Sequence, residues 1–176
     1  MLTKIKNFFI VLLLVLVISQ FLRPEKNEAS YDSITAFEEA TLVSSDVKTI
    51  LENNCYDCHT NSTRYPLHME VSPVSHWMAY HIEEGKEHFN ISEWESYTIE
   101  EKDHKLEEFI EEIRMMKMPL KPYTWINGEL SSQDREKLIK WAKETRIKIK
   151  EKPLDSLPKA ESDTIVVDSV KVDSIK

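Results

Sequence analysis

An unbroken apolar run, Phe8–Ile18, dominates the hydrophobic pattern near the N-terminus. With its apolar flanks the stretch is about 18 residues long, close to the roughly 20 that a helix needs to cross a bilayer. Lys4 and Lys6 precede it, which favours a cytoplasmic N-terminus with the rest of the chain exported. A cleaved signal peptide would end in small residues, whereas Ser19–Pro24 contains bulky ones. The pattern therefore predicts an uncleaved transmembrane signal anchor over residues 1–22.

Four later segments carry apolar residues at helical spacing. The predicted helices run from Ser44 or Ser45 to Cys55 and over Val74–Phe89, Ile99–Lys117 and Ser131–Lys150. Their expected inward positions are Val47, Ile50 and Leu51; Trp77, Met78, His81 and Ile82; Leu106, Phe109, Ile110 and Ile113; and Leu138, Ile139, Trp141 and Ala142. Thr98 and Glu101 form a capping box for the third helix, and Met115 and Met116 are expected to fill the core at its end. No segment of the domain resembles a convincing strand, so we predict an all-α fold.

Polar and irregular segments flank these helices. Residues 23–44 predict a linker, or an arm that lies over the domain. Residues 151–176 contain helix-breaking prolines and a short near-repeat, and predict a mostly disordered tail. The expected organisation is an anchor at 1–22, a linker at 23–44, a helical domain at 45–150 and a tail at 151–176.

Composition and charge narrow the function classes. The net charge is −8 and no basic stretch is interleaved with aromatic residues, which argues against nucleic-acid binding. Only 2 glycines occur in 176 residues, which argues against a Gly-rich phosphate loop. Nothing in the sequence identifies a small-molecule substrate. Nucleic-acid binding and phosphate binding by a glycine-rich loop are therefore not expected functions of this chain.

The candidate chemistry centres on the pentapeptide Cys55-Tyr56-Asp57-Cys58-His59. C-x-x-C-H is the pattern by which a c-type haem is attached covalently. Its two thiols add across the haem vinyl groups, and the imidazole of the next residue binds the iron. These are the only two cysteines in the chain, so none remains for a disulfide framework. The motif predicts one covalently bound haem c.

Two other sites share part of this pattern. A zinc half-site needs two more Cys or His ligands in a compact pair, but the chain has no second C-x-x-C and its histidines are irregularly spaced. A thiol–disulfide active site normally lies where a strand meets a helix, and no strand is predicted before Cys55. Both alternatives are weaker than haem attachment.

Three residues outside the pentapeptide are candidate partners of a haem. Met118 precedes Pro119 on a predicted loop, and a methionine ligand opposite His59 gives a six-coordinate iron with a raised potential. His81 could also reach iron, although a core histidine is the simpler interpretation. Arg64 could pair with a haem propionate through a bidentate bond, or be an ordinary surface arginine.

The order of a first helix, C-x-x-C-H, a Met-Pro loop and a last helix resembles class I c-type cytochromes. More narrowly, residues 20–145 resemble a family of bacterial membrane-anchored haem-binding domain proteins. The matching stretches are Gln20–Pro24, Asn54–Asn61, Thr63–Pro66, Ser72–Trp77, Glu84–Trp94, Met118–Tyr123 and Leu130–Asp134. The resemblance implies a small cytochrome c-like domain around one covalent haem, without an assigned reaction. His76 departs from it, because a second aromatic residue often stands there beside Trp77.

These features predict an electron carrier and no enzyme, because no convincing catalytic side chains accompany the motif. The expected location is the periplasmic side of the inner membrane, with a single-pass anchor and redox proteins of the membrane or periplasm as partners. A peroxidase-like enzyme, or a gas or redox sensor with a displaceable sixth ligand, is the alternative. A structural role, with haem only as a folding cross-link, is a third.

Overall fold

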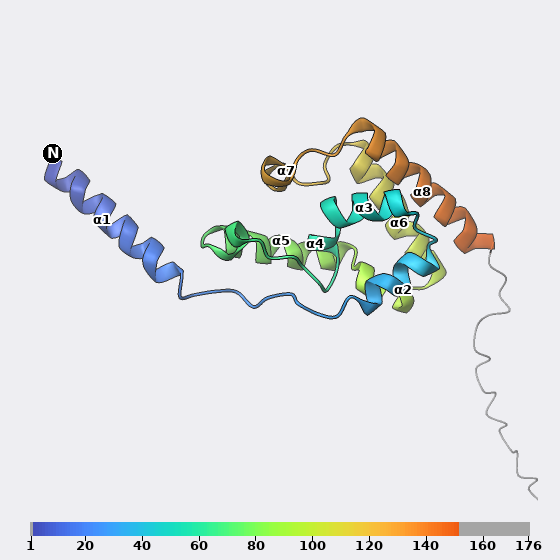
Figure 1. Cartoon of the computed structure of the whole chain (residues 1–176), viewed down its shortest axis with the longest axis horizontal. Coiled ribbons are helices and arrows are strands. Elements are labelled where there is room, and N and C mark those ends of the chain that lie inside the picture. The colour runs from blue at the N-terminus through green and yellow to red at the C-terminus, as the bar shows by residue number, and fades with distance from the viewer. Residues whose placement is uncertain (1, 152–176) are drawn as a thin grey trace, which may run out of the picture.

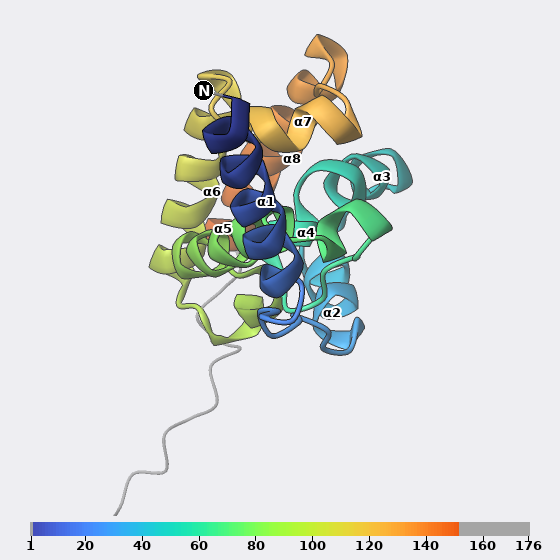
Figure 2. The ribbon, with the colours of Figure 1, turned by 90° about the vertical axis from the view of Figure 1, so that its left-hand side faces the viewer.

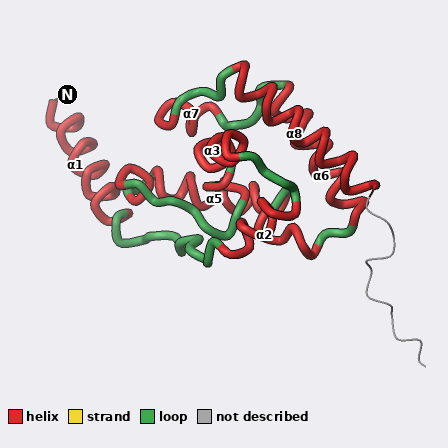
Figure 3. Tube along the Cα trace, turned by 45° about the vertical axis from the view of Figure 1, so that its right-hand side comes forward, coloured by secondary structure: helices red, strands yellow, loops and turns green. Residues whose placement is uncertain are grey.

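The computed structural model describes residues 2–151, which contain helices and no strand (Figure 3). The α-helices are α1 (Leu2–Ser19), α2 (Asp32–Ala40), α3 (Ser45–Asn54), α4 (Tyr56–His59), α5 (Val74–His88), α6 (Ile99–Arg114), α7 (Lys121–Asn127) and α8 (Ser132–Glu151). Two 3₁₀ helices, η1 (Leu67–Glu70) and η2 (Ile91–Ser96), lie in the connections. The all-α prediction is confirmed. The tail was predicted over residues 151–176; Glu151 is the last residue of α8, and the rest lies outside the described part of the chain.

The first helix, α1, projects away from the domain and has no buried residue (Figure 1). Its 18 residues have a mean hydropathy of 2.1, so by length and composition it could cross a membrane. The side chain of Gln20, just after α1, is hydrogen-bonded twice to the backbone of Ser72. Gln20 Nε2 donates to the Ser72 carbonyl, and the Ser72 amide donates to Gln20 Oε1, both at 3.1 Å. The end of α1 is therefore attached to the loop before α5.

The segment predicted as a linker, residues 23–44, belongs in part to the core. It contains α2, where Ile34 and Phe37 are fully buried. The Phe37 ring makes edge contacts with Trp94 and Trp141, with ring centroids 5.2 Å and 6.0 Å apart. The linker prediction is wrong here because two apolar residues one helical turn apart are too short a pattern to show burial. The domain therefore begins before residue 45.

The long helices α6 and α8 pack side by side on the side of the domain away from α1 (Figure 1). The predicted caps are present: Thr98 and Glu101 form the capping box of α6, and the Ser44 side chain accepts from the Val47 amide at the start of α3. The Asp103 carboxylate on α6 accepts from Arg146 Nε on α8 at 2.6 Å. This ion pair joins the start of α6 to the last part of α8.

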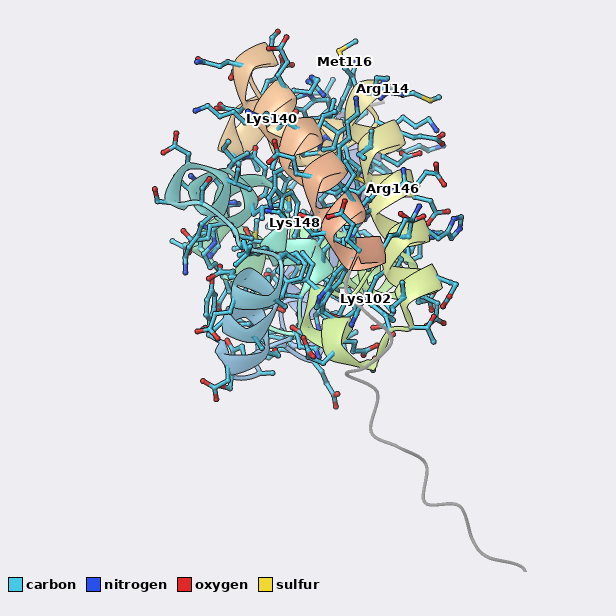
Figure 4. The ribbon with its side chains drawn as sticks, turned by 90° about the vertical axis from the view of Figure 1, so that its right-hand side faces the viewer. Lys102, Arg114, Met116, Lys140, Arg146 and Lys148 are labelled. Carbon is cyan, nitrogen blue, oxygen red and sulfur yellow. The ribbon has the colours of Figure 1, made fainter. Side chains whose placement is uncertain are left out.

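The end of α6 differs from the prediction. The helix stops at Arg114 because Met116 adopts a positive φ of 56°, which ends the helical path. Met115 and Met116 were expected in the core, but they are 60% and 69% exposed, and Met116 points outward (Figure 4). Beyond them the chain turns back and brings Met118 against the main core. The turn at Met116 therefore separates two exposed methionines from a partly buried one.

Candidate functional site

A cleft of about 970 Å³, including its open mouth, lies between the pentapeptide, α5, α6 and the segment before α7. Five candidate haem residues from the sequence line it together: Cys55, Cys58, His59, His81 and Met118. The remaining walls are mainly apolar or aromatic, with Trp77 from α5, Phe109 and Ile113 from α6, and Tyr123 from α7. Residues separated by more than sixty positions thus meet at one concave site.

The pentapeptide forms the short helix α4 at the end of α3. The Cys55 amide still donates to the Leu51 carbonyl of α3 at 2.8 Å, and the His59 amide donates to the Cys55 carbonyl at 3.0 Å. Between them, Tyr56 is buried and its hydroxyl donates to Glu38 of α2 at 3.1 Å. The motif is therefore fixed from both α2 and α3.

One ring nitrogen of His59, Nδ1, is hydrogen-bonded, and the other, Nε2, is free of hydrogen bonds within residues 2–151. Its Nδ1 lies 3.0 Å from the carbonyl oxygen of Phe89. Because a carbonyl only accepts, Nδ1 must carry the proton and Nε2 keeps its lone pair. Burial lowers the pKa of His59, which favours the neutral imidazole. A neutral ring with a free Nε2, oriented through Nδ1, is the form that ligates a metal.

Both thiols are free of disulfide bonds, and their environment keeps them protonated. Burial raises the pKa of Cys55 and of Cys58 to about 12. Thiol–disulfide exchange needs a thiolate at physiological pH, usually produced by a lowered pKa. The cleft therefore does not favour a thiol–disulfide enzyme. Among residues 2–151, no cluster of three or more His, Cys, Asp or Glu residues could hold a metal ion.

Comparison with known proteins identifies the kind of domain. The model of the haem-binding domain family matches residues 14–144 of the chain. The chain belongs to the haem-binding domain family. No curated protein and no solved structure matches the chain. The match includes α2, in agreement with its burial in the core.

The cleft fits the haem that this family binds. It brings two free thiols, an imidazole with a free nitrogen and a thioether to the same apolar surface. Thiols, imidazole and thioether are the groups that hold haem iron and its macrocycle in c-type proteins. Cys55, Cys58, His59 and Met118 are therefore the residues able to hold a haem in this cleft.

Close packing of α5 on the motif depends on Gly85, which sequence analysis did not single out as a site residue. A Cβ placed on Gly85 would lie 2.6 Å from the carbonyl oxygen of Cys58. Only glycine permits this approach without movement of the backbone. The signal in the sequence was weak: Gly85 is one of only two glycines, at the end of an apolar stripe.

Arg64 lies outside the cleft and pairs with a carboxylate of the motif. Its Nε and Nη2 donate to the two carboxylate oxygens of Asp57 at 3.0 Å and 2.9 Å, and it does not line the cleft. Asp57 is only 4% exposed and also accepts from the Tyr123 hydroxyl at 2.8 Å. The structure therefore gives no support to pairing with a haem propionate, because this buried carboxylate takes the guanidinium. Asp57 and Tyr123 were not singled out from the sequence.

Met118 and His81 both line the cleft, so both candidates for the sixth ligand are near the haem site. Met118 is partly buried, and its amide donates to the Glu112 carbonyl at 3.4 Å. His81 Nδ1 lies 2.8 Å from the Trp77 carbonyl, and the two rings stack with centroids 4.1 Å apart. The stacking and the hydrogen bond hold the His81 ring against the preceding turn of α5, and its Nε2 has no hydrogen-bond partner in the described part of the chain.

Proposed function

We propose that this haem-binding protein is a membrane-tethered electron carrier with one c-type haem. Cys55 and Cys58 would attach the haem covalently, and His59 and Met118 would bind its iron. One observation carries the proposal: the two thiols, the oriented imidazole and the thioether line the same cleft. When bound, the haem supplies an iron that accepts and releases one electron.

The protein's own residues have simple tasks in this proposal. The Phe89 carbonyl holds the His59 ring through Nδ1, which would leave Nε2 free to bind the iron. Thioether ligation by Met118 stabilises the reduced iron and raises the potential. Neither task moves a proton or activates a substrate, so electron transfer needs no further catalytic group. We therefore expect no enzymatic turnover.

The tether supports a role beside membrane redox partners. With α1 in the cytoplasmic membrane and Lys4 and Lys6 on the cytoplasmic side, the haem domain lies on the periplasmic side. A tethered carrier has a high effective concentration near partners in the same membrane. Those partners are redox proteins of the membrane or the periplasm.

A denatured-protein spectrum tests covalent attachment. In alkaline pyridine, the unfolded full-length protein should give the spectrum of a haem bound through two thioether bonds. In a separate sample, the haem should stay with the protein during acid–acetone extraction. The mass of the protein should exceed that of the polypeptide by one haem. Cys55→Ser with Cys58→Ser should lose the haem in the extraction. Complete extraction of haem from the unmodified protein would contradict the proposal. The same mass spectrum shows whether α1 is retained or cleaved off.

A second function is favoured by the position of His81. A histidine beside an open or displaceable iron site could move a proton in a peroxidase-like enzyme, or respond to a bound gas. A high-spin ferric spectrum with rapid cyanide binding would support this alternative. A low-spin spectrum that His81→Ala leaves unchanged would support the carrier.

A further inference from the structure

An apolar groove of about 860 Å³, including its open mouth, lies next to the haem cleft, between η1, the start of α5 and α7. Three of its lining residues are exposed hydrophobic side chains: Trp125 is 79% exposed, Ile126 58% and Val74 36%. We call these three residues the α7 face. Leu67 of η1 does not line the groove but precedes the lining residue His68, and it is a further exposed hydrophobic residue at 83%. A concentration of this kind marks an interaction surface.

The position of α1 indicates what covers the α7 face. The paired hydrogen bonds between Gln20 and Ser72 fix the end of α1 two residues before Val74. Pro73, between Ser72 and Val74, lines the groove. Figures 1 and 2 show α7 and the start of α5 on the side of the domain toward α1. If α1 crosses a bilayer, the α7 face lies near the membrane surface.

The chemistry of the α7 face suits that surface. Tryptophan is enriched where a membrane meets water, because its ring is apolar and its N–H is polar. The helix α7 has one basic residue, Lys121, and no acidic one. The acidic residue of η1, Glu70, is neutralised by Lys26 at 2.7 Å. No uncompensated negative charge of α7 or η1 therefore opposes contact with anionic lipid.

The far side of the domain has a different character. Figure 4 shows Lys102, Lys140, Arg146 and Lys148 on the side turned away from α1. The exposed hydrophobic residue Ile147 lies among them, 57% exposed on α8. This charged side provides a matched reference for the α7 face.

We propose that the α7 face docks on the lipid bilayer beside α1, with Trp125 and Ile126 among the lipid head groups and the first acyl carbons. This inference rests on the membrane tether of the proposed function. It sets the orientation of the domain: Trp77 and Tyr123 line both the groove and the haem cleft. Docking therefore holds one wall of the haem cleft next to the membrane surface, where membrane redox partners lie.

Photo-crosslinking in lipid identifies the occupant directly. The haem-loaded full-length protein is reconstituted in vesicles of phosphatidylethanolamine and phosphatidylglycerol. The photoreactive residue p-benzoylphenylalanine replaces Trp125, Ile126, Ile147 or Leu12 in separate variants, and adducts are identified by mass spectrometry. Ile147 is the exposed control, and Leu12 reports on α1. An unchanged haem spectrum shows that each variant is folded; position 126 stands in for 125 if that variant fails.

The expected result is a phospholipid adduct at positions 125, 126 and 12, and no phospholipid adduct at position 147. A lipid adduct at 12 without one at 125 and 126 overturns the docking and leaves the tether intact. Adducts at 125 and 126 to a second copy or another protein also overturn the docking. No adduct at 12 refutes the tether, and lipid adducts at 125 and 126 would then support docking without it.

Discussion

The motif side of the haem cleft and the Met118 side are held in different ways. On the motif side, hydrogen bonds fix Tyr56 to Glu38, and His59 to the Phe89 carbonyl. On the other side, Met118 is positioned by a long backbone bond of 3.4 Å and by apolar packing, after a turn whose methionines are exposed. A thioether is a weak hydrogen-bond acceptor, so packing alone holds its side chain.

This difference suggests that haem attachment and the reduction potential of the haem depend on different sides of the cleft. The motif side, where we propose that the haem is attached, is built into the hydrophobic core and into buried polar contacts, so changes there should affect folding and haem retention together. Changes on the Met118 side, where we propose the sixth ligand, should leave the fold intact. Changes there should affect the spectrum and the reduction potential.

The largest effect is expected from Gly85→Ala, on the motif side. The new methyl group would meet the Cys58 carbonyl at 2.6 Å, and backbone cannot yield as a flexible side chain does. We expect a loss of about 3 kcal/mol in unfolding free energy, at the upper end for overpacking, with a lower haem content. Chemical denaturation and the haem-to-protein absorbance ratio measure both.

The other glycine provides the control for Gly85→Ala. Gly128 has a φ of 89° and nothing within 4 Å of its Cβ position. Gly128→Ala should destabilise through backbone strain, but its haem content should be that of the parent. An equal loss of haem in both variants would mean that general instability, not packing on the motif, explains the effect.

An intermediate effect is expected from Arg64→Ala. The buried carboxylate of Asp57 would lose its guanidinium but keep the Tyr123 hydroxyl, and solvent already screens Arg64, whose side chain is 54% exposed. We expect a loss of about 1–2 kcal/mol in stability, with an unchanged reduction potential. Arg114→Ala, at an exposed position, is the control. A shift in potential without loss of stability would instead indicate a propionate partner.

The smallest effect concerns the ion pair between α6 and α8, which lies near the start of α6 and away from both sides of the cleft. The Arg146 guanidinium, and to a smaller extent the Lys150 ammonium, lower the pKa of the Asp103 carboxyl from 3.8 to about 2. A lowered pKa in the folded state stabilises the protein above the unfolded pKa, and this contribution is lost as the pH falls from about 4 to 2. Arg146→Gln should therefore cost about 1 kcal/mol at pH 6.

The cost of Arg146→Gln should disappear near pH 2, and urea denaturation at several pH values checks this. Lys140→Gln removes a looser surface pair with Glu144, at 3.9 Å, and should change nothing. A pH-independent cost for Arg146→Gln would show that packing of its side chain, not the ion pair, stabilises the contact.

Much of the fold followed from local patterns. The helices α3, α5, α6 and α8 were predicted because each repeats apolar residues at helical spacing, and Thr98 and Glu101 marked the start of α6. The helix α2 was missed because only tertiary contacts with Trp94 and Trp141 bury Phe37. The prediction that Met115 and Met116 are buried was wrong. The positive φ at Met116 turns the chain there, and the apolar character of the two residues does not reveal that turn.

The site was predictable where chemistry lies within a short motif. Cys55, Cys58 and His59 share one pentapeptide, and Met118 was found through its neighbour Pro119. The structure brings these four residues to one cleft. The approach of Gly85 to Cys58 depends on how α5 crosses the motif, and spacing along the chain does not contain that information. The choice of Asp57 as the partner of Arg64 depends likewise on burial.

Replacement of Met118 tests the central claim most directly, with Met116 as a matched methionine that is 69% exposed. Reduction potential and ferric spectrum are measured on the full-length protein, Met118→Ala and Met116→Ala. Met118→Ala should keep its covalent haem, lose the methionine-to-iron charge-transfer band and have a lower potential, while Met116→Ala matches the parent. A Met118→Ala protein with the parent's spectrum and potential would contradict ligation by Met118.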